Sequence, residues 1–91
     1  MEDLREFTTG PLKILTESVM NYTQILIDIE GNRRLIPHVI GFDCHFNMVL
    51  TNVKEMWTET RRGGILENKE RYIAKMFLPG HNVKIIVKLA Y

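Results

Sequence analysis

The sequence predicts a mainly β domain in which one N-terminal helix caps a small antiparallel barrel of five short strands. Three observations favour this fold. Apolar residues first recur at the spacing of a helix, and then alternate with polar residues at the spacing of strands. Turn-forming residues separate the alternating segments at intervals of about eight to twelve residues, which is typical of small closed or nearly closed β-barrels.

Length and composition indicate a single domain over residues 1–91. A chain of 91 residues with 45% apolar and 25% charged residues can form a core, but a domain of this size buries only roughly 60–65% of its unfolded surface. We therefore expect partner subunits to supply further burial. The net charge of +1 is weak support for an isolated nucleic-acid binder, although subunits around a common pore could pool their charges.

The sequence favours an intracellular protein without a membrane segment. Its N-terminus has no basic region leading into an apolar run, and no window approaches about 18 uninterrupted apolar residues. The single cysteine, Cys44, excludes an internal disulfide framework and cannot form a zinc site without histidines. Because no Cys-x-x-Cys or His-x-x-x-His spacing occurs, we expect no metal, and no cofactor is indicated.

The helix is expected over residues 11–20. Pro11 follows Gly10 at the first helical position, and apolar residues then recur at spacings of three and four, at Leu12, Leu15 and Val19. A helix of about ten residues is roughly 15 Å long and is not stable alone, so its apolar side must pack on the barrel.

Two strands joined by a tight turn are expected after the helix. Isoleucines at alternate positions from 25 to 29 share one face of the first strand. Gly31-Asn32 is typical of a hairpin turn, and the second strand follows from Arg33 to Ile40. Pro37 interrupts this strand. Because proline donates no ladder hydrogen bond, we expect a bulge, a sharp bend or an unpaired edge there.

Three further strands complete the predicted sheet. They cover residues 48–57, 71–78 and 83–89, with a long mobile polar loop over 58–69 and a tight turn over 79–82. Strict alternation places the even-numbered residues of the fourth strand on one face, and residues 73 and 77 on the other. In the fifth strand, apolar residues at odd positions alternate with lysines. Apolar residues on both faces indicate a second burial surface, where another chain could add a strand.

The connection between the second and third strands carries the residues best suited to binding. It reads Phe42-Asp43-Cys44-His45-Phe46-Asn47, and it places a carboxylate, an imidazole and an amide within five positions. These groups could form a small recognition pocket, or simply an Asx-type turn. A hydrolase or nuclease using Asp43 and His45 is disfavoured, because no nucleophile, metal cluster or second acid–base partner is visible.

The sequence around this loop resembles the two motifs of the Sm family of RNA-associated proteins. The first motif is recognisable from Leu35 to Asn52, inside a segment of about 22–57, and the second from Tyr72 to Val83, inside about 71–89. The matching residues are Phe42-Asp43, His45, Asn47, Met48, Leu50 and Asn52, and then Met76-Phe77-Leu78 and Gly80. The resemblance implies the Sm fold, a strongly bent SH3-like barrel, and assembly into seven-membered rings through strand pairing.

The resemblance also implies roles for individual residues. His45 would stack on an RNA base, Asn47 would read the base edge, and Asp43 would hold Asn47 in place by a hydrogen bond. Gly80 would let the backbone approach the nucleotide closely. Stacking on one aromatic ring is worth about 1–3 kcal/mol per base. The arginines Arg61 and Arg62 most simply belong to a solvated loop, but they could contact RNA phosphates outside the ring.

Three residues depart from the family pattern. Pro79 replaces the arginine expected before Gly80, so the second face of a bound base loses a cationic plane. Cys44 stands where a basic residue is usual, and Pro37 where a glycine is usual. The fold should tolerate these changes more readily than an RNA contact should.

The resemblance finally implies a function. The chain would be a non-catalytic subunit of a heteroheptameric Sm ring that binds uridine-rich single-stranded snRNA and supports snRNP assembly and pre-mRNA splicing. Its partners would be other Sm core proteins, with the first D-type and F proteins as neighbours, and it would act in the nucleus after assembly in the cytoplasm. Neither a membrane nor a small-molecule substrate is expected. The alternative is a ring scaffold subunit whose degenerate pocket contributes protein contacts and little RNA binding.

Overall fold

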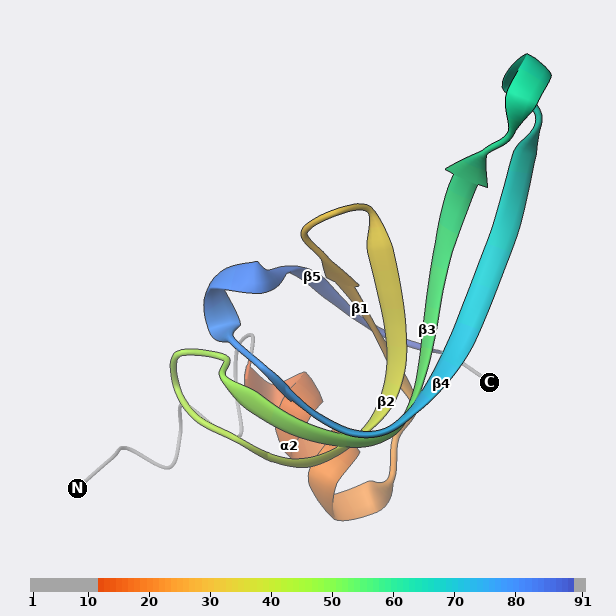
Figure 1. Cartoon of the computed structure of the whole chain (residues 1–91). Coiled ribbons are helices and arrows are strands. Elements are labelled where there is room, and N and C mark those ends of the chain that lie inside the picture. The colour runs from red at the N-terminus through yellow and green to blue at the C-terminus, as the bar shows by residue number, and fades with distance from the viewer. Residues whose placement is uncertain (1–11, 90–91) are drawn as a thin grey trace.

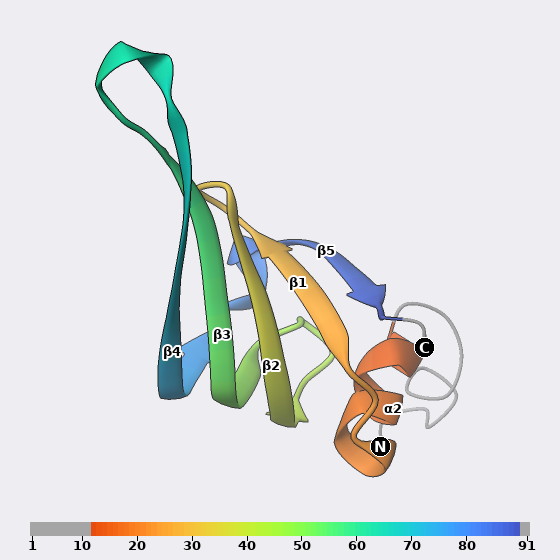
Figure 2. The same cartoon turned by 90° about the vertical axis from the view of Figure 1, so that its right-hand side faces the viewer.

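The computed structural model describes residues 12–89 and shows one helix followed by five antiparallel strands (Figure 1). The strands pair in the order β4-β3-β2-β1-β5 and form a single, strongly bent sheet (Figure 2). This arrangement confirms the predicted fold. The elements are α2 (Lys13–Asn21), β1 (Ile25–Ile29), β2 (Arg33–Phe42), β3 (Met48–Thr60), β4 (Leu66–Leu78) and β5 (Val83–Lys88).

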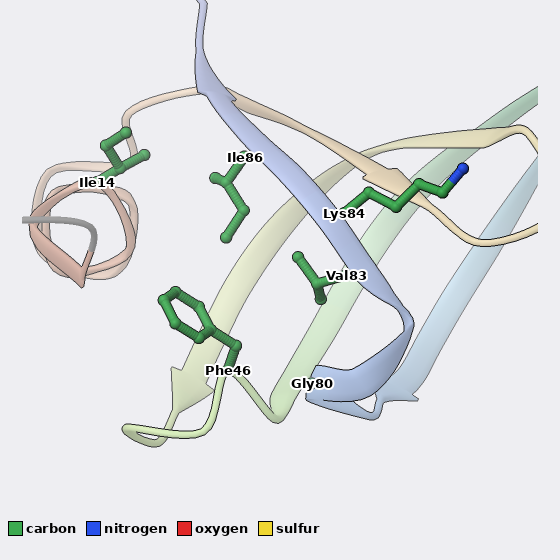
Figure 3. Close-up of a pocket in the computed structure, with 6 residues that line it drawn as sticks. All are labelled: Ile14, Phe46, Gly80, Val83, Lys84 and Ile86. Atoms are coloured by element: carbon green, nitrogen blue, oxygen red, sulfur yellow. The ribbon is translucent and has the colours of Figure 1, made fainter.

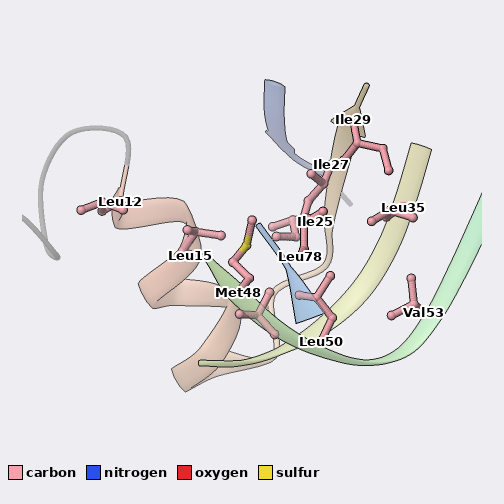
Figure 4. Packing of buried hydrophobic residues seen from close by; sticks show 11 residues of the cluster. Leu12, Leu15, Ile25, Ile27, Ile29, Leu35, Met48, Leu50, Val53 and Leu78 are labelled. Atoms are coloured by element: carbon pink, nitrogen blue, oxygen red, sulfur yellow. The ribbon is translucent and has the colours of Figure 1, made fainter. Parts of the chain in front are cut away.

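The helix α2 packs its apolar side against the sheet, as its sequence predicts. Leu12 and Leu15 are buried in the same cluster as the inward residues of the strands (Figure 4). Val19 packs against that cluster. Pro11 lies outside the described residues. Lys88 of β5 donates a hydrogen bond from Nζ to Oε2 of Glu17 at 3.3 Å, which joins the exposed side of the helix to the edge strand. No helix within residues 12–89 is long and apolar enough to span a membrane.

The β1–β2 hairpin forms at the predicted turn. Gly31 and Asn32 both adopt positive φ angles, 85° and 57°. Two successive residues of this kind match the twist of the flanking strands, which explains why glycine and asparagine stand here. In β2, Pro37 lies at a shift in the register with β3, between Ile36 and His38. The predicted irregularity at Pro37 is therefore confirmed.

The alternation of inward and outward residues shifts by one position within β3. Because of this shift, the faces predicted for the residues of the fourth strand are partly wrong. Met48 and Leu50 are buried, but Asn52 adopts a left-handed conformation (φ 48°), and the next buried residues are Val53 and Glu55. β4 follows the same shift, because Ile73 pairs with inward-facing Val53 and also packs on the core. Strict alternation through the fourth strand therefore fails at this bend. Tyr72, Ala74 and Phe77 are exposed, whereas Ile73, Met76 and Leu78 face the core.

A bulge in β5 makes the alternation predicted for the fifth strand wrong as well. Asp28 pairs with Ile85, and Ile29 pairs with Val83, so Lys84 is an extra residue with no partner in β1. One inserted residue moves every following side chain to the other face. Val83 and Ile86 consequently pack against the core, while Ile85 and Val87 are exposed.

The predicted long loop over 58–69 is wrong, because most of it is strand. The pairs Thr58↔Asn68, Glu59↔Glu67 and Thr60↔Leu66 continue the β3–β4 ladder, and only residues 61–65 remain in the connection. Polar side chains stabilise the extension, since Thr58 Oγ1 donates to Asn68 Oδ1 at 3.2 Å. The result is a long two-stranded hairpin that projects beyond the rest of the sheet (Figures 1 and 2).

Candidate functional site

The loop between β2 and β3 is organised around the carboxylate of Asp43. Its Oδ1 accepts hydrogen bonds from the backbone N–H groups of His45 at 2.8 Å and Asn47 at 3.1 Å. Backbone bonds close the loop further, because Phe46 N–H donates to Asp43 O at 3.1 Å and Asp43 N–H donates to Asn47 O at 3.1 Å. Phe46 takes a positive φ of 64°. The sequence thus encodes a defined Asx-type turn rather than a flexible connection.

Asn47 joins this loop to the turn after β4. Its Nδ2 donates to Asp43 Oδ2 at 3.0 Å, and its Oδ1 accepts from the backbone N–H of Gly80 at 2.7 Å. A carboxylate only accepts and a backbone N–H only donates, so the two partners determine which way the amide points. Among residues 12–89, no further group binds this amide, so one N–H and one oxygen lone pair of Asn47 are left over. The amide can therefore offer a donor and an acceptor side by side, in a fixed orientation.

Gly80 allows the two loops to touch. A Cβ atom at this position would lie 1.8 Å from the carbonyl oxygen of His45 and 2.9 Å from its carbonyl carbon. No side chain larger than hydrogen fits at that distance. The absence of a side chain at Gly80 therefore lets this turn touch the backbone of the β2–β3 loop. Gly80 begins a short 3₁₀ turn, Gly80–Asn82, in which Asn82 N–H donates to Pro79 O at 3.1 Å; this confirms the predicted tight turn.

The hydrogen bonds to Asp43 also set its charge state. The amide of Asn47 is the largest cause that lowers the pKa of the Asp43 carboxyl, partial desolvation opposes it, and the N–H groups of His45 and Asn47 lower it further. Each donor stabilises the carboxylate over the neutral acid. Asp43 is therefore ionised at neutral pH and holds the turn in its charged form.

The neighbours of His45 point inward and leave its side chain at the surface. Cys44 and Phe46 pack against the core, whereas His45 is exposed. Phe46 also lines a pocket of about 250 Å³ between α2 and β5, which the sequence did not reveal (Figure 3). The pocket is lined by Ile14, Phe46, Gly80, Val83, Lys84 and Ile86. Among the side chains that line it, only that of Lys84 is charged.

The structure does not bring Arg61 and Arg62 to this site. Both lie at the tip of the β3–β4 hairpin, at the opposite end of β3 from the loop that carries Asp43 and Asn47 (Figure 1). Arg61 Nε contacts Glu67 Oε2 at 2.5 Å, so its charge is paired. Arg62 is exposed and makes no ion pair with any residue in the described range 12–89.

Pro79 adopts an extended conformation immediately before Gly80 (φ −64°, ψ 139°). Its side chain has neither a charge nor a hydrogen-bond donor. The turn beside Asn47 therefore presents backbone groups and a pyrrolidine ring where the resemblance leads us to expect an arginine.

Sequence reasoning missed a cluster of charged residues at the base of the hairpin. Glu55 is only 3% exposed, and Arg33 and Arg71 both bind its carboxylate beside Trp57. Two signals were available in principle. Glu55 occupies an inward position two residues after buried Val53, and Arg71 is its cross-strand partner. The second signal depends on the register, which the sequence alone did not provide.

The sheet is bent, five-stranded and capped by a helix, and hydrogen bonds of Asn47 join the β2–β3 loop to the turn after β4. These features define an Sm-like domain. The family model described as LSM domain matches residues 17–88, and the chain therefore belongs to the LSM-domain family. The resemblance to Sm proteins is confirmed.

Among curated relatives, the chain is similar to Small nuclear ribonucleoprotein Sm D2 of Schizosaccharomyces pombe, with 47% identity over 92% of this chain and 77% of the relative. It is also similar to Probable small nuclear ribonucleoprotein Sm D2 of Dictyostelium discoideum, with 48% identity over 97% of this chain and 84% of the relative. A solved structure described as a heptameric archaeal Sm protein matches with a TM-score of 0.63 and 20% identity, covering 86% of this chain and 98% of that one. That similarity supports the fold alone.

Proposed function

We propose that this chain is a non-catalytic subunit of a heteroheptameric Sm ring that binds uridine-rich single-stranded snRNA, and that it thereby supports snRNP assembly and pre-mRNA splicing. The names of its relatives, small nuclear ribonucleoprotein Sm D2, support a place in a ribonucleoprotein.

The observation that carries the proposal is the amide of Asn47, held between Asp43 Oδ2 and the N–H of Gly80. Uracil presents a donor, N3–H, beside an acceptor oxygen. A fixed amide with one free N–H and one free lone pair can bind both, whereas cytosine would present an acceptor and a donor in the reverse order. His45 is exposed beside this amide and supplies a ring on which the base stacks. Asp43 acts by positioning Asn47, and Gly80 by letting the second loop approach.

The two edge strands supply the surfaces for neighbouring subunits. β4 and β5 end the sheet on either side, and each exposes apolar residues: Tyr72 and Phe77 on β4, and Ile85 and Val87 on β5. Strand pairing between such edges would bury these side chains and satisfy the free backbone groups. By family resemblance the neighbours are the first D-type and F proteins, and the assembled particle acts in the nucleus after assembly in the cytoplasm.

Pro79 favours a second candidate, a ring scaffold subunit with a degenerate base pocket. Without a guanidinium before Gly80, one face of a bound base has no cationic partner. In that case the other subunits would bind the RNA, and this chain would contribute protein contacts.

One experiment separates the two functions. Rings assembled with the wild-type chain, His45→Ala or Asn47→Ala are purified, and the dissociation constant for uridine-rich RNA is measured separately from the yield of rings. The base-binding function predicts normal ring yield with affinity lowered by about five- to 150-fold per removed base contact, equivalent to about 1–3 kcal/mol. Unchanged affinity in both variants would establish the scaffold function instead.

A further inference from the structure

The base of the β3–β4 hairpin carries two arginines oriented by one buried carboxylate. Arg33 Nη1 donates to Glu55 Oε2 at 3.2 Å, and Arg71 Nε donates to Glu55 Oε1. Both guanidiniums also lie over the ring of Trp57, at 5.5 Å and 5.8 Å from its centroid. A buried acceptor and an aromatic surface together fix two long side chains that would otherwise be mobile.

Most of the hydrogen-bonding capacity of the two arginines is unused. Each guanidinium has five N–H groups. Within residues 12–89, Arg33 uses Nη1 and Arg71 uses Nε, both for the same carboxylate. Their side chains are 44% and 57% exposed, whereas that of Glu55 is 4% exposed. Two positive charges therefore share one buried negative charge, and the remaining N–H groups are accessible from solvent.

A backbone hydrogen bond connects this cluster to the loops of the candidate site. Glu30 N–H, at the start of the β1–β2 turn, donates to Asn82 O at 3.0 Å. Asn82 ends the 3₁₀ turn that begins with Gly80, the residue bound to Asn47. Arg33 is the first residue of β2, directly after the same β1–β2 turn. Arg33 therefore lies three positions along the chain from Glu30, which is hydrogen-bonded to the turn that carries Gly80.

We propose that Arg33 and Arg71 form a phosphate-binding site for the backbone of single-stranded RNA that extends beyond the base held at Asn47. The inference rests on the proposed RNA-binding function and deepens it. Phosphate is the matching ligand because its oxygens accept several N–H bonds at once, and guanidinium groups bind it in two-pronged geometry. Glu55 and Trp57 are positioning residues, since they orient the arginines without reaching the RNA.

Two of the neighbouring carboxylates are paired with lysines, Glu67 with Lys69 at 3.1 Å and Glu70 with Lys54 at 3.2 Å. Glu59 accepts a hydrogen bond from the Trp57 indole at 3.0 Å but keeps its negative charge. Glu59 and Glu30 are both exposed, and a passing RNA strand must avoid them. The other ligand with suitable oxygens is a carboxylate of an adjacent subunit, which the test below detects as a loss of assembly.

The test uses assembled rings containing Arg33→Gln, Arg71→Gln or Arg33→Lys, with Arg34→Gln as the matched control. Arg34 has the same charge and is the next residue, but it pairs with Met56 rather than facing Glu55. Two RNAs are compared by fluorescence anisotropy over a series of KCl concentrations. One is a short uridine-rich oligonucleotide, and the other is the same oligonucleotide with single-stranded extensions at both ends.

The proposal expects weaker binding of the extended RNA in both glutamine variants, with the slope of log K against log salt reduced by about 0.7 per lost phosphate contact. Binding of the short RNA should be unchanged, Arg33→Lys should retain most of the slope, and Arg34→Gln should behave as wild type. Equal slopes in wild type and both glutamine variants would overturn the proposal. Loss of rings in those variants would also overturn it, in favour of a subunit carboxylate.

These outcomes are distinct from failure of the base site. If His45→Ala and Asn47→Ala leave the short RNA bound as in wild type, the proposed base contact is wrong, whatever the arginine variants do. If those two variants lose the short RNA while Arg33→Gln and Arg71→Gln bind both RNAs normally, only the phosphate site is wrong.

Discussion

Replacing Gly80 with alanine should damage both the fold and the candidate site. The added Cβ would lie 1.8 Å from His45 O and 3.0 Å from the carbonyl carbon of Phe46, which are backbone atoms that cannot rotate away. The two loops must then separate, and the 2.7 Å bond from Gly80 N–H to Asn47 Oδ1 is lost. Overpacking costs about 1–3 kcal/mol, and a lost hydrogen bond adds about 1 kcal/mol.

The measurement is urea unfolding followed by the fluorescence of Trp57, the single tryptophan of the chain. Gly80→Ala should lower the unfolding free energy by about 2–4 kcal/mol. Gly41→Ala is the matched control, because a Cβ there meets nothing within 4 Å, and its effect should stay within about 0.5 kcal/mol. If the two variants unfold at the same urea concentration, the close contact between the loops does not contribute as described.

Three further predictions concern charge and packing. Hydrogen bonds from Asn47, opposed by partial desolvation, lower the folded-state pKa of Asp43. The stabilisation that this carboxylate gives the fold is therefore present above its unfolded pKa of about 3.9 and is lost as pH falls through the folded value. Asp43→Asn should flatten this acid dependence in pH-dependent unfolding, and an unchanged curve would contradict the prediction. Glu55→Gln should lower the unfolding free energy by about 1–3 kcal/mol, since it weakens the bonds from Arg33 and Arg71, whereas exposed Glu70→Gln should change it little; equal midpoints would refute this. Leu50→Ala, at a fully buried position, should cost about 2–5 kcal/mol in the same assay, against a near-neutral effect for exposed Leu66→Ala.

The sequence predicted the elements with strong local signals. Alternating isoleucines in β1 and Gly31-Asn32 at the hairpin turn define local geometry through backbone preferences of a few residues. The helix was recognisable from the spacing of Leu12, Leu15 and Val19. Each of these patterns has one strong local interpretation, and the structure agrees with it.

The faces of β4 and β5 were not predictable, because single-residue irregularities changed the phase of alternation. The extra residue Lys84 has no distinctive sequence signature. Asparagine tolerates the left-handed conformation that Asn52 adopts, but its presence inside an apolar strand pattern does not predict a change of phase. The hairpin extension over residues 58–60 and 66–69 has the sequence pattern of a loop, because both of its faces are polar or exposed. A strand without a buried face lacks the pattern on which sequence reasoning depends.

The candidate site was predictable in part. The resemblance indicated Asp43 and Asn47 as a pair, and their side chains are hydrogen-bonded. The bond from Gly80 to Asn47 and the clash that excludes any side chain at Gly80 depend on the distance between two loops. Only the folded chain provides that distance, and the same is true of the cluster around Glu55.

The bond between Asn47 and Gly80 joins residues that are 33 positions apart in the chain. Closing a segment of that length has an entropic cost that local structure cannot offset. The bond between Asn47 and Gly80 therefore forms only when the intervening β3–β4 ladder has paired. A nascent or misfolded subunit therefore has the residues of the site without its geometry. Under the proposed function, only a folded subunit would therefore hold the Asn47 amide in the orientation that binds uracil.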